Sequence, residues 1–169
     1  MKAGLFRSAL IGALLSCSLA INAAETRFDA HYFYQSEAEL QAKGVKAEDL
    51  ARFSRQFQAQ VYKLLKKPKL SSSSGYVVVA LREDGQAAAW LDMQPALHEY
   101  YAQQIDELVQ KVPPFAVKKG IVVFAIKMAI DTAVHTKKAQ PEPEEFTEAR
   151  KKLGDKAEIE ELVYSVWPE

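Results

Sequence analysis

The segment that decides the fold runs from Gly75 to Asp92 and reads GYVVVALREDGQAAAWLD. Its first half, Tyr76–Leu81, is built from β-branched, aromatic and aliphatic residues, which is typical of a strand. Asp84-Gly85 follows, and this pair favours a tight hairpin turn because glycine adopts positive φ at little cost. The alternating residues of Gln86–Asp92 predict the returning strand.

An amphipathic helix is predicted on each side of this hairpin. In Lys46–Lys67, apolar residues recur at spacings of three and four and form one stripe on a helix: Leu50, Phe53, Phe57, Val61 and Leu64. A second helix is predicted from Pro95 to about Lys111, with an apolar stripe of Leu97, Tyr101, Ile105 and Leu108. Pro68 and Pro113 are expected to end the two helices, because proline cannot continue the hydrogen-bonding pattern.

A third strand is predicted at Ile121–Ile130, IVVFAIKMAI. Its apolar run is nearly continuous, which indicates partial burial on both faces. The order from 46 to 132 is therefore α-β-β-α-β. A three-stranded antiparallel sheet packed by two helices, a two-layer α+β sandwich, is the expected architecture.

Two flanks surround this block. In the lead-in, residues 25–45, the aromatic segment Glu25–Tyr34 predicts either a short strand or a packing hook. Ser36 and Glu39 have the spacing of a capping box, and Gly44 is suited to end the helical turn that they open. In the tail, residues 133–169, the polar stretch Lys137–Glu145 predicts a linker.

A C-terminal amphipathic helix is predicted after that linker. Asp155 and Glu158 have capping-box spacing, and the residues that follow share one apolar face: Ile159, Leu162, Val163 and Val166. The chain is thus expected to end in a helical arm.

The first 24 residues have the layout of a secretory signal peptide. Lys2 and Arg7 precede a short apolar run, and small residues end it at Ala23-Ala24. An uncleaved membrane anchor is a second interpretation, although the run is short for a membrane span. In a third, Leu14-Leu15-Ser16-Cys17 resembles a bacterial lipoprotein box, and Cys17 is lipidated. Attachment to a membrane is expected only through such a lipid or an uncleaved signal.

The composition excludes several classes of protein. The 169 residues have equal numbers of basic and acidic side chains and a formal net charge of zero, which argues against a nucleic-acid partner. Cleavage would remove Lys2 and Arg7 and leave a mildly acidic chain. The single cysteine can form neither an internal disulfide nor a cysteine-based zinc site.

Four segments of the chain together resemble the C-terminal domain of the TonB and TolA envelope proteins. They are Gly75–Gly85, Leu91-Asp92, the proline-aromatic step Val112–Phe115 and the closing strand. The likeness covers about half of the chain. It implies a small domain that holds partner proteins, often by strand addition at a sheet edge. The long spacer of those proteins is missing between residues 25 and 46, so the resemblance implies the binding domain and puts energy transduction in doubt.

No residue pattern indicates catalysis or a cofactor. The three histidines, His31, His98 and His135, lack a second ligand at metal-binding spacing. Asp106 and Glu107 are adjacent on a predicted helix and do not face each other. The serine run Ser71–Ser74 is interpreted as a loop. We therefore expect no enzyme activity, no cofactor and no metal.

The sequence thus predicts a protein-interaction domain in the periplasm of a Gram-negative bacterium, with envelope proteins as partners. Strand addition would use an open sheet edge. Two edge strands are candidates, one represented by Ala88 and Trp90 and the other by Ile121, Val122, Val123, Phe124, Ala125 and Ile126. A chaperone, adaptor or inhibitor acting through the C-terminal arm is the alternative, and a small periplasmic enzyme is a third, less favoured one.

Overall fold

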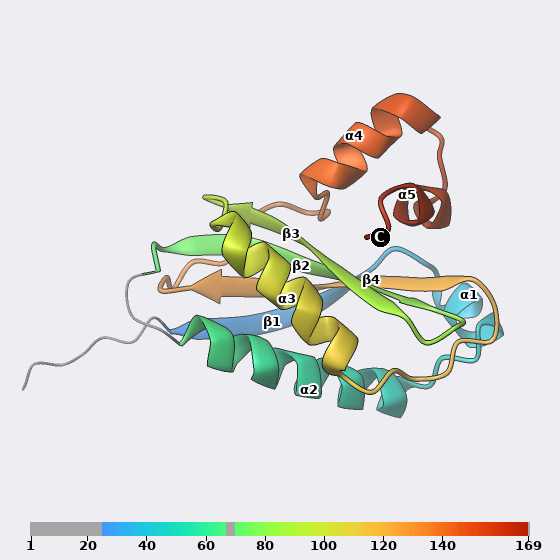
Figure 1. The fold of residues 1–169 in the computed structure, drawn as a ribbon, viewed down its shortest axis with the longest axis horizontal. Coiled ribbons are helices and arrows are strands. Elements are labelled where there is room, and N and C mark those ends of the chain that lie inside the picture. Colours follow the sequence, from blue (N-terminus) through green and yellow to red (C-terminus); the bar gives the residue numbers. More distant parts are fainter. Residues whose placement is uncertain (1–24, 67–69, 169) are drawn as a thin grey trace, which may run out of the picture.

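A computed structural model describes residues 25–66 and 70–168. The predicted signal segment with Cys17 and the residues around Pro68 lie outside them. The protein is an α+β fold built around one antiparallel sheet (Figure 1). The strands are β1 (Thr26–Phe33), β2 (Ser73–Arg82), β3 (Ala87–Gln94) and β4 (Ile121–Ile130). The helices are α1 (Glu37–Ala42), α2 (Ala47–Leu65), α3 (Glu99–Lys111), α4 (Glu144–Leu153) and α5 (Ile159–Ser165).

The predicted hairpin forms one side of the sheet, with β2 inside and β3 at the edge. β2 pairs with β3 from Ser74↔Gln94 to Leu81↔Ala87, and Gly85 has the positive φ of 82° that its turn requires. β2 also pairs with β4, from Ser73↔Ile130 to Arg82↔Ile121. The boundaries predicted for the third strand, Ile121–Ile130, are those observed for β4.

The sheet has four strands, in the order β1-β4-β2-β3, so the expectation of three was wrong. The additional strand is β1, which comes from the aromatic lead-in and pairs with β4 between Thr26↔Ile130 and Phe33↔Phe124. A β-bulge interrupts the pairing between Phe28 and His31. Of the two interpretations of the lead-in, the strand is confirmed.

The two long helices cover one face of the sheet, as predicted. Phe53, Phe57 and Val61 of α2 and Ile105 and Val109 of α3 are fully or almost fully buried in this layer. α2 also packs beside β1 (Figure 1). The apolar stripes of both helices thus face one core, whose sheet side is made by alternate residues of the strands.

The C-terminal arm covers the opposite face of the sheet. Phe146 of α4 and Val163 of α5 are buried against a second apolar cluster that contains Tyr76, Val78 and Trp90 (Figure 1). The expected two-layer sandwich is therefore wrong, because the sheet is covered on both faces. Strands β2 and β4 are apolar on both faces and need a cover on each side.

Polar contacts fix the segment that leads to the arm. The hydroxyl of Tyr76 donates to the carbonyl of Lys138 at 2.8 Å, and the hydroxyl of Tyr34 donates to the carbonyl of Pro141 at 2.7 Å. Asp92 accepts from the ammonium of Lys138 at 2.6 Å and from the backbone N–H of Glu142 at 2.7 Å. The predicted linker thus lies along the sheet, and its last residues already belong to α4.

The local signals had mixed outcomes. The capping box of Ser36 and Glu39 is present, and Gly44 has a positive φ of 76° just after α1. The box predicted at Asp155 is wrong, because Glu158 is the N-cap residue of α5 and Glu161 its partner. Within the described residues, no helix has the length and apolar character that a membrane span requires.

Candidate partner-binding edges

β4 is an interior strand, so the expectation that Ile121–Ile126 form an open edge is wrong. Its backbone pairs with β2 on one side and with β1 on the other. The side chains of Ile121, Val122, Val123, Phe124, Ala125 and Ile126 are all fully buried. The backbone groups that strand addition needs are already used along most of this strand.

β3 is an edge strand, as the hairpin prediction allowed, but it is covered. Ala88 and Trp90 face the arm and are 0% and 6% exposed. The N–H of Arg82 donates to Gln86 O at 2.9 Å, so residue 86 and every second residue after it direct their backbone toward β2. The residues between them direct their backbone outward: Ala87, Ala89, Leu91 and Met93. Ala87, Ala89 and Met93 are each only 7% exposed.

A carboxylate from α3 occupies the middle of the β3 edge. The N–H of Ala89 donates to Asp106 Oδ1 at 2.9 Å, and the amide of Gln110 donates to the other oxygen at 3.0 Å. Burial raises the pKa of Asp106, and these two hydrogen bonds lower it in part. A carboxylate that caps an edge amide prevents another strand from pairing there.

β1 is the open edge of the sheet. Asp29, Ala30, His31 and Phe33 are all exposed, and no strand within residues 25–66 and 70–168 pairs with its outer side. The N–H of Tyr34 donates to Val123 O, so this residue and Tyr32 direct their backbone toward β4. The N–H and C=O groups of His31 and Phe33 therefore point outward, free for an added strand.

An aromatic cluster supports this open edge from the α2 side. The ring of His31 lies 6.2 Å from that of Phe33 and 6.1 Å from that of Phe124, and its Nε2 is 3.0 Å from the hydroxyl of Ser54. The partial burial of the imidazole lowers its pKa below the ordinary value of 6.5. The ring of His31 is thus directed toward α2, while its backbone groups point outward.

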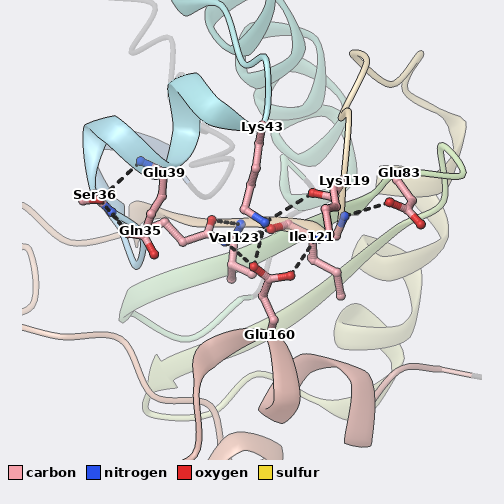
Figure 2. Close-up of polar contacts among 10 residues, drawn as sticks. Gln35, Ser36, Glu39, Lys43, Glu83, Lys119, Ile121, Val123 and Glu160 are labelled. Atoms are coloured by element: carbon pink, nitrogen blue, oxygen red, sulfur yellow. Dashed lines mark hydrogen bonds and ion pairs between the residues drawn. The ribbon is translucent and has the colours of Figure 1, made fainter.

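Side chains replace β1 beyond its last residue, beside the start of β4 (Figure 2). The amide of Gln35 donates to Ile121 O at 2.8 Å and accepts from Val123 N at 3.0 Å. Glu160 of α5 accepts from Ile121 N at 3.1 Å and from the ammonium of Lys43 at 2.6 Å. Gln35 and Glu160 therefore close the first part of β4, and Glu160 joins the arm to the rest of the molecule.

The other residues considered from the sequence stabilise helices, strands and loops. His98 caps α3 through its side chain, and Ser73 belongs to β2 and donates to Pro95 O at 2.6 Å. Among the described residues, no group of histidine, cysteine, aspartate and glutamate side chains could hold a metal ion. Asp106 and Glu107 have separate partners, because Glu107 accepts from Gln103 and Gln104.

Comparison with protein-family models, with curated proteins and with solved structures gives no match for this chain. Its function must therefore be argued from its own geometry. Sequence reasoning missed β1 as the open edge, although the aromatic segment that contains it was a candidate strand. It also missed Gln35, Lys43 and Glu160, for which no local sequence signal exists.

Proposed function

We propose that this chain is an exported protein-interaction domain, similar to the C-terminal domain of TonB and TolA, that binds envelope or exogenous proteins by strand addition at β1. The observation that carries the proposal is the exposed outer side of β1. Its free backbone groups offer a partner main-chain hydrogen bonds, while the aromatic cluster beside it offers contacts for alternate side chains.

The difference between the two sheet edges supports this choice. At β3, Asp106 uses the outward N–H of Ala89, and helices lie on both sides of the strand. At β1, Phe33 is 39% exposed although it is a large apolar side chain. An exposed aromatic residue beside unpaired backbone groups is the combination that an extended peptide can use.

The likeness to TonB and TolA rests on residues 46–132. The unit α2-β2-β3-α3-β4, with both helices on one face of the sheet, has the element order that the resemblance implies. A location in the periplasm of a Gram-negative bacterium follows from the expected signal peptide, and both remain part of the proposal. The lead-in and the arm are additions to that unit.

In the alternative proposal the C-terminal arm itself binds the partner. Phe146 and Val163 of the arm are at most 1% exposed, since they pack against the sheet. A partner could reach these side chains only if the arm left the sheet. The β1 proposal needs no such rearrangement and is therefore preferred.

Proline at position 33 tests the proposal. Phe33→Pro removes an outward N–H and no hydrogen bond to β4, and edge strands tolerate proline at such positions. Phe33→Ala is the matched control, because it removes the same ring and keeps the N–H. Both variants would serve as baits for affinity capture from envelope extracts, with mass spectrometry of the captured proteins.

We expect Phe33→Pro to lose the partners that the wild-type chain captures, and Phe33→Ala to retain them at a reduced level. Near-ultraviolet circular dichroism should show that both variants are folded. Equal capture by wild type and Phe33→Pro would remove β1 from the mechanism. Mass spectrometry of the mature N-terminus in the same samples would test signal cleavage and the lipidation of Cys17.

A further inference from the structure

A small surface pocket opens where the arm meets the start of β4. It has a volume of about 320 Å³ and is lined by Glu39, Ala42, Lys43, Lys119, Gly120 and Glu160. The carboxylate of Glu160 extends from α5 into a ring of donors that come from other parts of the chain (Figure 2). The site lies apart from the outer side of β1.

Three groups hold this carboxylate. Oε1 accepts from Lys43 Nζ at 2.6 Å and from Gln35 Nε2 at 3.4 Å, and Oε2 accepts from Ile121 N at 3.1 Å. One donor is an ammonium, one an amide and one a backbone N–H. Donors of these kinds, aimed at both oxygens, are how proteins bind carboxylates.

The donors are held in place without help from Glu160. The ammonium of Lys43 also donates to Lys119 O at 3.3 Å, and the amide of Gln35 is fixed by Ile121 O at 2.8 Å and Val123 N at 3.0 Å. Gln35 is only 6% exposed. Ile121 is fixed by its pairing with Arg82. The cradle should therefore persist when its carboxylate is removed.

Gly120 permits the close approach of the carboxylate. Its φ is +71°, and a Cβ at this position would lie only 2.4 Å from Glu160 Oε2. Its N–H donates to Glu83 at 2.8 Å, which fixes the turn. With Glu160 counted as the ligand, the lining keeps two lysines, Lys43 and Lys119, against one glutamate, Glu39.

We propose that this cradle, formed by Gln35, Lys43, Gly120 and Ile121, is a carboxylate-binding site for acidic side chains of polypeptides, and that Glu160 is its internal ligand. An acidic segment of a partner protein would compete with the arm for the same donors. The site is independent of strand addition at β1, so either proposal can fail without the other.

Removal of the internal ligand tests the site. In the full chain with Glu160→Ala, the deleted atoms correspond to acetate, which should bind in the vacated space. N-acetyl-glutamate α-amide presents the same carboxylate on a peptide-like group. Both would be titrated while the amide resonance of Ile121 is followed by NMR, with chloride at equal ionic strength as the blank.

We expect a saturable shift of the Ile121 amide with both compounds, and tighter binding of the glutamate derivative, since the pocket has room for its backbone. In Glu160→Ala combined with Lys43→Met, binding should weaken about tenfold or more, because a charge-assisted hydrogen bond is lost. The wild-type chain should show no saturable shift.

Three results would overturn the proposal. One is the absence of saturation in Glu160→Ala, and another is equal binding with and without Lys43. The third is binding of acetate but not of the glutamate derivative, because a site limited to small free carboxylates could not bind acidic side chains of a polypeptide.

If Glu160→Ala does not fold, a double-mutant cycle with Glu160→Gln and Lys43→Met replaces the titration. The losses in melting temperature should then be clearly non-additive, because either change alone already breaks the charged pair. Additive losses would overturn the proposal as well.

Discussion

Gln35 does at residue scale what a strand residue would do. Its amide replaces the pairing that β4 loses where β1 ends, by one hydrogen bond to Ile121 and one to Val123. Gln35→Leu would leave a buried N–H and a buried C=O without partners. We expect a loss of about 2–4 kcal/mol in the free energy of unfolding, measured by urea denaturation.

Gln60→Leu is the control for that substitution, because Gln60 is exposed on α2. Its effect should stay within about 0.5 kcal/mol. Equal effects at both positions would mean that the hydrogen bonds of Gln35 contribute nothing specific.

His31 should make the stability depend on pH. Its folded-state pKa is lowered by burial from 6.5, so between the two values the unfolded chain binds more protons than the native protein. The contribution of His31 to the free energy of unfolding is therefore fully present above pH 6.5 and is lost as the pH falls through the lowered pKa. His31→Gln should lose less stability than wild type between about pH 8 and about pH 5, measured by urea denaturation.

An identical pH dependence in wild type and His31→Gln would contradict the packing described for this ring. Glutamine at this position is polar and does not titrate. The comparison therefore isolates the protonation of one side chain.

Local signals predicted some single residues well and others not at all. The capping box of Ser36 and Glu39 depends on residues three apart, and it is present. The role of Gln35 depends on residues 86 and 88 positions away. Such a partner is fixed by the folded sheet, and no spacing in the sequence encodes it.

At the scale of elements, the strands were predicted more reliably than their order. The hairpin and β4 follow from local composition, whereas the interior position of β4 depends on its pairing with the distant β1. The run Ile121–Ile126 did contain a usable signal. Strands that are apolar on both faces are typical of the middle of a sheet, and this could have excluded β4 as an edge.

Helix α4 was missed for a related reason. Its sequence, EEFTEARKKL, has only two buried residues, Phe146 and Ala149. A helix with so narrow an apolar face gives a weak periodic signal. Its position is determined by the sheet face that it covers.

Phe146 should control the docking of the arm. It is 1% exposed, and its ring lies 5.2 Å from that of Trp90. Phe146→Ala should cost about 3–5 kcal/mol. The two tryptophans, Trp90 and Trp167, pack together at this interface. In Phe146→Ala, the red shift of their fluorescence should therefore occur at a lower urea concentration than the loss of the far-ultraviolet circular dichroism signal.

Phe57→Ala is the matched control on the opposite face of the sheet, where Phe57 is fully buried. It should lower stability by a similar amount, but with fluorescence and circular dichroism changing together. Coincident transitions in Phe146→Ala would show that the arm and the sheet unfold as one unit.

At the scale of the whole molecule, the arm is a layer of the fold. Deletion of residues 137–169 would expose the face that contains Tyr76, Val78 and Trp90. We expect the shortened chain to bind the dye ANS and to self-associate, measured by fluorescence and analytical ultracentrifugation. A monomeric shortened chain that binds no dye would contradict this role of the arm.

The class of the fold could be predicted from the sequence, but the number of its layers could not. The apolar stripes of α2 and α3 predicted one covered face of an antiparallel sheet. The second cover depends on Phe146 and Val163 packing against a sheet that precedes them in the chain. The spacing of apolar residues in Ile159–Val166 predicts an apolar helix face, but it does not say which surface that face covers.

The pairing of β1 with β4 has a consequence for the synthesis of the protein. Thr26 pairs with Ile130, so the first strand of the sheet has no partner until roughly a hundred further residues have been made. At a translation rate of about 5–20 residues per second, this delay lasts about 5–20 s. During that time β1 has neither side paired, and the nascent chain cannot complete its sheet before β4 has left the ribosome.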